Sequence, residues 1–163
     1  MERVRTDTLE IACEVAGPNE GVPVILLHGW PYDPRTYDDM VQPLAAAGCR
    51  IIVPYLRGFG PTRFLSKDTP RSGEQAALGH DLIELMNGLS LTRAALVGYD
   101  WGGRAACIVA ALWPERVRCL VTGGGYNMPR GPNFAPSTIR RSISASSIMK
   151  AWSSSAAIGC SGV

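Results

Sequence analysis

Asp100 stands at a position where a carboxylate can act as a nucleophile. It lies in the segment Gly98–Gly103, whose letters G-Y-D-W-G-G have the form Gly-x-nucleophile-x-Gly. The apolar residues 93–99 predict a strand that leads into this segment, and residues 102–113 predict a buried helix that leads out of it. A sharp strand-to-helix turn lifts its central side chain above the sheet, where a ligand can reach it.

A carboxylate at this turn implies an ester intermediate. It is already charged, so it needs no base before it attacks a carbon atom and displaces a leaving group. The N-terminus of the following helix favours the ionised form of Asp100 by roughly 0.3–1 kcal/mol. A water molecule activated by a general base, usually a histidine, would then cleave the ester.

A second motif supplies hydrogen-bond donors to the same place. His28-Gly29-Trp30-Pro31 follows the apolar run 22–27, which predicts a buried strand. In this arrangement one oxyanion-hole amide comes from the loop after the first central strand, and the other from the residue after the nucleophile. We therefore expect the backbone amides of Trp30 and Trp101 to form the oxyanion hole, with His28 and Gly29 shaping its turn.

The glycines on either side of Asp100 serve the backbone rather than the chemistry. Gly98 and Gly102 carry no Cβ atom, so neighbouring backbone can pass the turn closely. We count both as residues of the candidate site for that reason.

The surrounding elements alternate between strands and helices. We predict one or two strands within residues 4–15. We expect Pro43 to break or kink the first helix, and we expect a polar loop to follow the predicted strand 50–54. This alternation predicts a mostly parallel sheet with helices on both faces. The further predicted strands are 22–27, 50–54, 93–99 and 117–121, the predicted helices are 37–45, 74–87 and 102–113, and the loop is 57–73.

Composition excludes several classes of function. The 163 residues are 46% hydrophobic and carry a net charge of only +2, which argues for one domain with a core and against a nucleic-acid binder. The charged N-terminus and the lack of long apolar runs predict a cytoplasmic protein that does not bind membranes. Five scattered cysteines and two histidines form no ligand cluster, so we expect neither a metal nor a cofactor.

The last part of the chain differs in character from the rest. All 14 acidic residues lie at or before Glu115, while residues 137–163 contain nine serines. We predict a partial core over residues 1–128 and a basic, Ser/Ala-rich, disordered tail over residues 129–163. A reading-frame shift or a premature stop in a longer gene would produce this change, and the downstream DNA would then encode the missing segments in another frame.

Three motifs together resemble those of the α/β-hydrolase superfamily, in its epoxide hydrolase and haloalkane dehalogenase branch. They are H-G-W-P, the R-G-F-G of Arg57–Gly60, and G-Y-D-W-G-G, and they occur in the order of that family within residues 8–127. The resemblance implies that Asp100 is the nucleophile and that Trp30 and Trp101 occupy the oxyanion-hole positions. Dehalogenases usually carry an Asn or Glu-type residue at position 30, so the tryptophan favours an epoxide hydrolase acting on a small electrophilic or ester-type molecule.

The resemblance also implies parts that this chain lacks. Members carry a helical cap with two tyrosines after the sixth strand, and then two strand–helix units with an acid and the catalytic histidine. Residues 128–163 contain no histidine, acid or tyrosine, so we expect about six strands, no cap and little or no turnover. His80, beside Asp81 in a helix that flanks the sheet, is expected to be an ordinary helix residue rather than the base.

A non-catalytic alternative remains open at this point. The chain could be a truncated or frameshifted product that presents an unpaired sheet edge where the missing strands belong. Such an edge would favour self-association.

Overall fold

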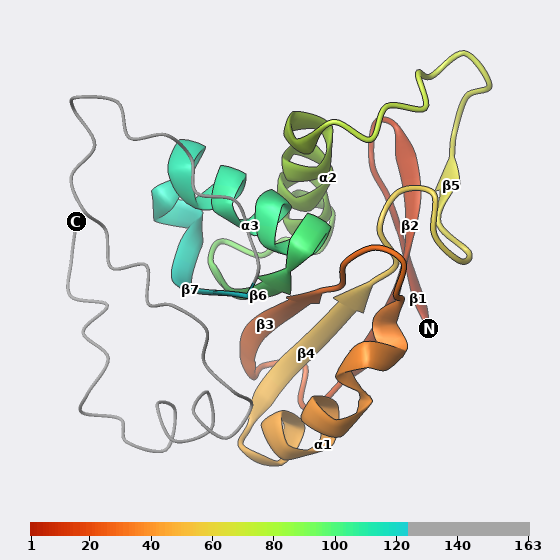
Figure 1. Ribbon diagram of the computed structural model, residues 1–163. Coiled ribbons are helices and arrows are strands. Elements are labelled where there is room, and N and C mark those ends of the chain that lie inside the picture. The colour runs from red at the N-terminus through yellow and green to blue at the C-terminus, as the bar shows by residue number, and fades with distance from the viewer. Residues whose placement is uncertain (124–163) are drawn as a thin grey trace, which may run out of the picture.

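A seven-stranded mixed sheet organises residues 1–123, the part of the chain that the computed structural model describes (Figure 1). The predicted boundary at residue 128 and the predicted tail at 129–163 lie outside the described residues. The strands are β1 (Glu2–Arg5), β2 (Leu9–Ala16), β3 (Val22–Leu27), β4 (Cys49–Pro54), β5 (Arg63–Phe64), β6 (Ala94–Tyr99) and β7 (Val117–Gly123). The helices are α1 (Asp38–Ala46), α2 (Gln75–Gly88) and α3 (Asp100–Leu112), with 3₁₀ turns at Pro34–Tyr37 and Pro114–Arg116.

The strand order places β3 and β6 side by side at the centre. The order is β1-β2-β4-β3-β6-β7, with β5 paired to β2. Strands β4, β3, β6 and β7 run parallel, whereas β1 and β2 join by antiparallel pairing. Within the β3–β6 pair Leu27 lies opposite Gly98. The two strands therefore end level, and the segments that follow them emerge next to each other.

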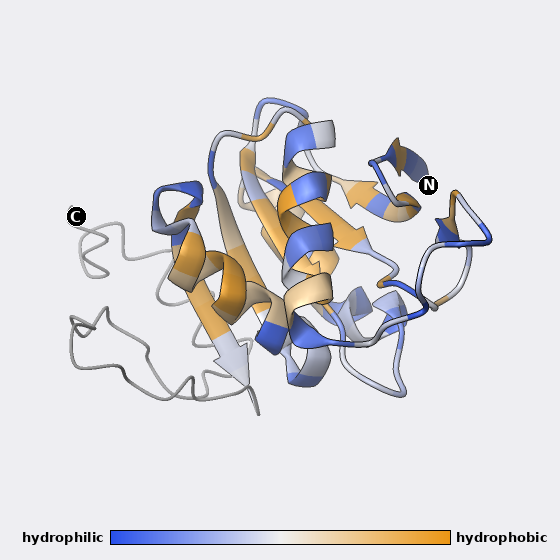
Figure 2. Ribbon diagram, turned by 90° about the horizontal axis from the view of Figure 1, so that it is seen from above, coloured by the Kyte–Doolittle hydropathy of each residue, from blue (hydrophilic) through white to orange (hydrophobic). Residues whose placement is uncertain are grey.

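Helices cover both faces of this sheet, as predicted. Figure 1 shows α2 and α3 on one face and α1 on the other. Strand β3 packs against the helices on both faces. Its residues Ile25 and Leu27 pack toward α2 and α3. Its residues Val24 and Leu26 pack toward α1. Figure 2 shows the resulting hydrophobic strands behind the outer helices. Burial on both faces explains why the strand sequence is continuously apolar.

The structure differs from the predicted elements in three places. The helix does not break at Pro43 but continues to Ala46, and the carbonyl of Pro43 accepts a hydrogen bond from the amide of Ala47. The predicted loop 57–73 contains the two-residue strand β5, which only its pairing with β2 reveals. Helix α3 begins at Asp100 rather than at Gly102, so the candidate nucleophile is the first residue of the helix.

A buried ion pair joins the loop after β4 to α2. The Arg57 guanidinium donates two hydrogen bonds of 2.6 Å to the carboxylate of Asp81, and both side chains are only 9% exposed. Arg57 also donates to the carbonyl oxygens of Ser72 and Ala77. Burial raises the pKa of Asp81, and the charge and hydrogen bonds of Arg57 oppose that rise. The pair therefore fixes where the loop runs over the sheet.

Removing one member of this pair should destabilise the fold strongly. We expect Asp81→Ala to lower the free energy of unfolding by about 3–5 kcal/mol, because it leaves the Arg57 charge buried without its carboxylate. Urea denaturation followed by circular dichroism measures this change. Asp68→Ala removes an exposed carboxylate and should have little effect, and equal effects of the two variants would contradict the role of the pair.

Candidate active site

The backbone at Asp100 adopts a conformation that few residues take. Its φ angle is +46°, between the extended N-cap residue Tyr99 and the first turn of α3. Side chains with a Cβ atom are disfavoured in this left-handed region, although aspartate tolerates it better than most. Non-glycine residues held in this way occur often at functional sites. The turn leaves about a third of the carboxylate side chain exposed.

Two glycines make this turn sterically possible. A Cβ atom on Gly98 would lie 2.6 Å from the backbone carbon of Gly102. A Cβ atom on Gly102 would overlap the carbonyl oxygen of Leu27. The start of α3 thus packs directly on the end of β3, backbone against backbone, and only glycine fits at both positions.

The loop after β3 is bonded to this turn at two points. The amide of Trp30 donates to Oδ2 of Asp100 at 3.0 Å, and the amide of Gly102 donates to the carbonyl oxygen of His28 at 3.0 Å. The indole of Trp30 is directed to solvent, since the residue is 63% exposed. It is therefore the backbone of residue 30, and not its side chain, that meets the carboxylate.

The backbone amide and the indole of Trp101 lie in different surroundings. Its amide lies in the first turn of α3, where a helix offers no acceptor four residues earlier. Its indole packs edge-on against the ring of Phe59 and faces Gly73. The structure thus sets Trp101 directly beside the carboxylate, with the indole anchored in the loop after β4.

His28 is a structural histidine in this arrangement. It is fully buried, its Nε2 accepts a hydrogen bond from the amide of Leu56 at 3.2 Å, and its Nδ1 lies 3.2 Å from the carbonyl oxygen of Gly29. These partners require the neutral ring with its proton on Nδ1. Burial lowers the pKa of His28, against the opposing effects of the Gly29 carbonyl and the Asp33 charge. Both ring nitrogens are engaged, so His28 shapes the turn and has no nitrogen left for a reacting group.

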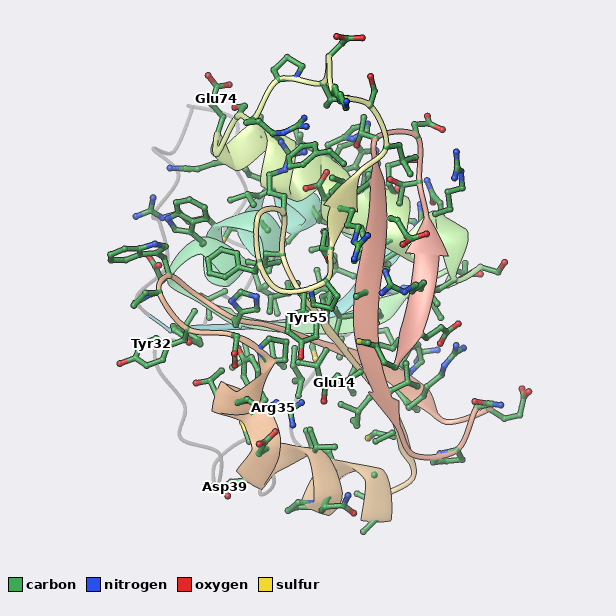
Figure 3. All side chains as sticks on the ribbon, turned by 90° about the vertical axis from the view of Figure 1, so that its right-hand side faces the viewer. Glu14, Tyr32, Arg35, Asp39, Tyr55 and Glu74 are labelled. Atoms are coloured by element: carbon green, nitrogen blue, oxygen red, sulfur yellow. The ribbon has the colours of Figure 1, made fainter. Side chains whose placement is uncertain are left out.

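Polar contacts fix the rest of the loop after β3. The carboxylate of Glu14 binds the guanidinium of Arg35 and accepts a hydrogen bond from the hydroxyl of Tyr55 at 2.8 Å, and these three side chains converge in Figure 3. The hydroxyl of Tyr37 donates to the carbonyl oxygen of Leu27 at 2.8 Å. The segment after β3 is therefore tied to β2 through Arg35 and to the end of β3 through Tyr37.

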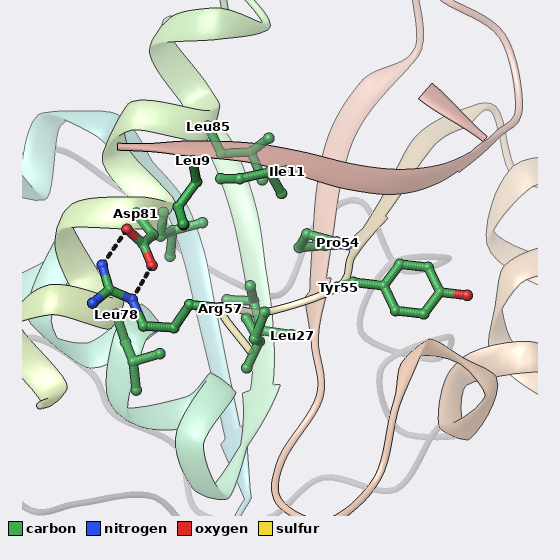
Figure 4. A pocket seen from close by; sticks show the side chains of 11 residues that line it. Leu9, Ile11, Leu27, Pro54, Tyr55, Arg57, Leu78, Asp81 and Leu85 are labelled. Carbon is green, nitrogen blue, oxygen red and sulfur yellow. Dashed lines mark hydrogen bonds and ion pairs between the residues drawn. The ribbon is translucent and has the colours of Figure 1, made fainter. Parts of the chain in front are cut away.

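A small apolar cavity lies away from the candidate nucleophile. Its walls include Leu9, Leu27 and Leu78, and the Arg57–Asp81 pair closes one side (Figure 4). Neither Asp100 nor Trp30 lines it. The cavity belongs to the packing between α2 and the sheet, so we do not assign it a ligand.

Two further residues with charged or titratable side chains, His80 and Arg104, differ in their relation to the candidate site. His80 is exposed on α2, which flanks the sheet, and its neighbour Asp81 is paired with Arg57. Sequence reasoning missed Arg104, whose guanidinium lies 3.8 Å from Oδ1 of Asp100. The spacing of four residues on one helix was the available signal, because such residues share a face.

Within residues 1–123 no three side chains of the usual metal-ligand types are grouped so as to hold an ion. In the same part of the chain, every helix is too short or too polar to cross a membrane.

The burial of neutral His28 should make the stability of the fold depend on pH. Because the pKa is lowered in the folded state, the unfolded chain binds more protons once the pH falls below about 6.5. The contribution is complete above that pH and is lost as the pH falls through the lowered pKa. Urea denaturation between about pH 7.5 and about pH 5.5 should show stability falling with pH.

A matched pair of variants separates His28 from the other titrating groups. His80→Gln removes the exposed histidine and should keep the pH dependence. His28→Gln should be less stable at every pH but should lose most of the slope in that range. An unchanged slope in His28→Gln would show that another group causes it.

Comparison with known proteins agrees with this architecture. Residues 22–147 match the family model described as alpha/beta hydrolase fold. Epoxide hydrolase 3 of Siraitia grosvenorii is 31% identical, and the match covers 81% of this chain and 41% of the relative. A haloalkane dehalogenase of Mycolicibacterium paratuberculosis is 34% identical, and the match covers 68% of this chain and 36% of the relative. A crystal structure from Klebsiella pneumoniae, provisionally described as an epoxide hydrolase, superposes with a TM-score of 0.75 at 52% identity over 77% of this chain and 42% of that one.

An epoxide hydrolase of Vigna radiata superposes with a TM-score of 0.71 at 27% identity, over 83% of this chain and 42% of that one. The chain thus spans less than half the length of these relatives. A family match over most of the chain, the strand order and the strained strand-to-helix turn together show that this chain belongs to the α/β-hydrolase fold family.

Proposed function

We propose that this chain carries the nucleophilic half of an epoxide hydrolase-like active site, with Asp100 as the nucleophile. The observation that carries the proposal is the strained turn that presents Asp100, together with the Trp30 amide 3.0 Å from its Oδ2. The similarity to epoxide hydrolases over most of this chain supports the same reaction class.

The two carboxylate oxygens would take different parts in the reaction. Oδ1 attacks a carbon of the epoxide, a new carbon–oxygen bond forms, and the ring carbon–oxygen bond breaks. The resulting alkoxide takes a proton from water. Oδ2, held by the Trp30 amide, becomes the carbonyl oxygen of the ester. Amides of Trp30 and Trp101 would stabilise the negative charge on that oxygen when water attacks the ester.

The second half of the cycle lacks a proton acceptor among the histidines of this chain. The sequence holds two of them, and His28 has both ring nitrogens engaged while His80 is exposed on α2. Loss of a catalytic base removes orders of magnitude in rate while leaving some assistance from the oxyanion hole. We therefore propose that the chain forms the ester and hydrolyses it slowly or not at all.

Two other functions compete with this proposal. A haloalkane dehalogenase-like reaction would use the same nucleophile, and one relative bears that name. A non-catalytic role would instead depend on β7, which pairs within residues 1–123 only with β6 and so offers an edge for self-association. The presentation of Asp100 favours the covalent chemistry, and size-exclusion chromatography would detect assembly.

Exposure of the chain to a neutral aryl epoxide such as styrene oxide should add one substrate mass. The carboxylate is alkylated once, and the ester persists because its hydrolysis has no base. Intact-mass spectrometry followed by peptide mapping measures the adduct and locates it on Asp100.

Two variants test whether Asp100 is the carboxylate that the epoxide alkylates. Asp100→Asn should remain unmodified, whereas Asp39→Asn, which changes another exposed carboxylate, should react like the original chain. An adduct that persists in Asp100→Asn would refute the assignment of the nucleophile. Steady formation of diol over many turnovers would refute the proposed loss of hydrolysis.

A further inference from the structure

Arg104 lies next to Oδ1 of Asp100, the carboxylate oxygen that the Trp30 amide does not bond. It follows Asp100 by one turn of α3, and its guanidinium lies 3.8 Å from Oδ1. The side chains of the two residues are 31% and 34% exposed, so both are partly open to solvent. Trp30 holds the other oxygen, Oδ2, through its amide. A positive charge therefore stands beside the nucleophilic oxygen and not beside the oxyanion hole.

The geometry of displacement at carbon decides what Arg104 would meet. The leaving group departs in line with the attacking oxygen and on the far side of the carbon. The remaining substituents spread sideways from that line, close to whatever flanks the nucleophile. A guanidinium beside Oδ1 thus faces a substituent of the substrate rather than its leaving group.

We propose that Arg104 binds a carboxylate substituent of the substrate, and that the preferred electrophile is a 2,3-epoxy acid. This inference rests on the proposed function of Asp100. A guanidinium recognises a carboxylate through paired, charge-assisted hydrogen bonds, which are stronger than those between neutral groups. A neutral epoxide would leave this interaction unused.

Charge balance during the reaction supports the same substrate class. Two carboxylates repel each other as an anionic substrate approaches Asp100, and the Arg104 charge offsets that repulsion. When Oδ1 bonds to carbon and the epoxide carbon–oxygen bond breaks, Asp100 becomes a neutral ester and the alkoxide takes a proton from water. The substrate carboxylate is unchanged in this step, and it replaces the anion that Arg104 faced.

The test compares the rates of single alkylation by two probes that differ in charge. Intact-mass spectrometry follows the adduct of 3-phenylglycidate, which carries a carboxylate, and of styrene oxide, which does not. Arg104→Met should lower the ratio of the phenylglycidate rate to the styrene oxide rate by about tenfold or more, the effect of losing a charge-assisted hydrogen bond to the substrate carboxylate. Arg104→Lys should restore part of the loss.

Controls separate a specific contact from general effects. Arg118→Met removes an exposed arginine of β7 and should leave both rates unchanged. Mandelate, an unreactive carboxylate, should protect the original chain against styrene oxide, while benzyl alcohol should not. This protection also decides the question if the Arg104 variants do not fold, as judged by circular dichroism.

The outcomes distinguish this inference from the proposed function. If styrene oxide modifies Asp100 but phenylglycidate has no advantage and mandelate gives no protection, the role of Arg104 is overturned and the nucleophile stands. Equal slowing of both probes in Arg104→Met likewise overturns it. If neither probe modifies Asp100, the nucleophile itself is wrong and the inference fails with it.

Discussion

The close approach of two backbones at the top of β3 and β6 sets the geometry of the whole site. Parallel pairing brings Leu27 opposite Gly98, so both strands end at the same level. The start of α3 then sits on the carbonyl of Leu27, where a side chain at Gly102 would not fit. This contact fixes the direction in which Asp100 leaves the sheet, and the Trp30 amide meets the carboxylate because both segments start from the same place.

An ion pair and hydrogen bonds around the site hold the loops next to this contact between α3 and β3. The buried Arg57–Asp81 pair holds the loop after β4, whose Leu56 amide donates to the ring of His28. His28 in turn supports the turn that carries Trp30. A charge pair on one side of the molecule is thereby linked to the site by a short series of hydrogen bonds, although none of these residues touches a reacting atom.

Sequence patterns predicted the parts of this fold that depend on local rules. The apolar runs around residues 22–27 and 93–99 gave buried strands, because strands covered on both faces are apolar throughout. The segment Gly98–Gly103 identified the turn, because its steric demand requires glycine at fixed positions. Parts that depend on distant partners escaped prediction. Strand β5 exists only through its pairing with β2, and the partnership of Asp81 with Arg57 spans 24 residues.

The strain at residue 100 belongs to the architecture rather than to the aspartate. The φ angle of +46° follows from how the helix start is seated on the sheet, and a different side chain would inherit the same position and the same neighbouring amide. A hydroxyl there would attack acyl groups, while a carboxylate attacks alkyl carbon. One scaffold can therefore exchange one reaction class for another by changing a single residue, without rebuilding the backbone that presents it.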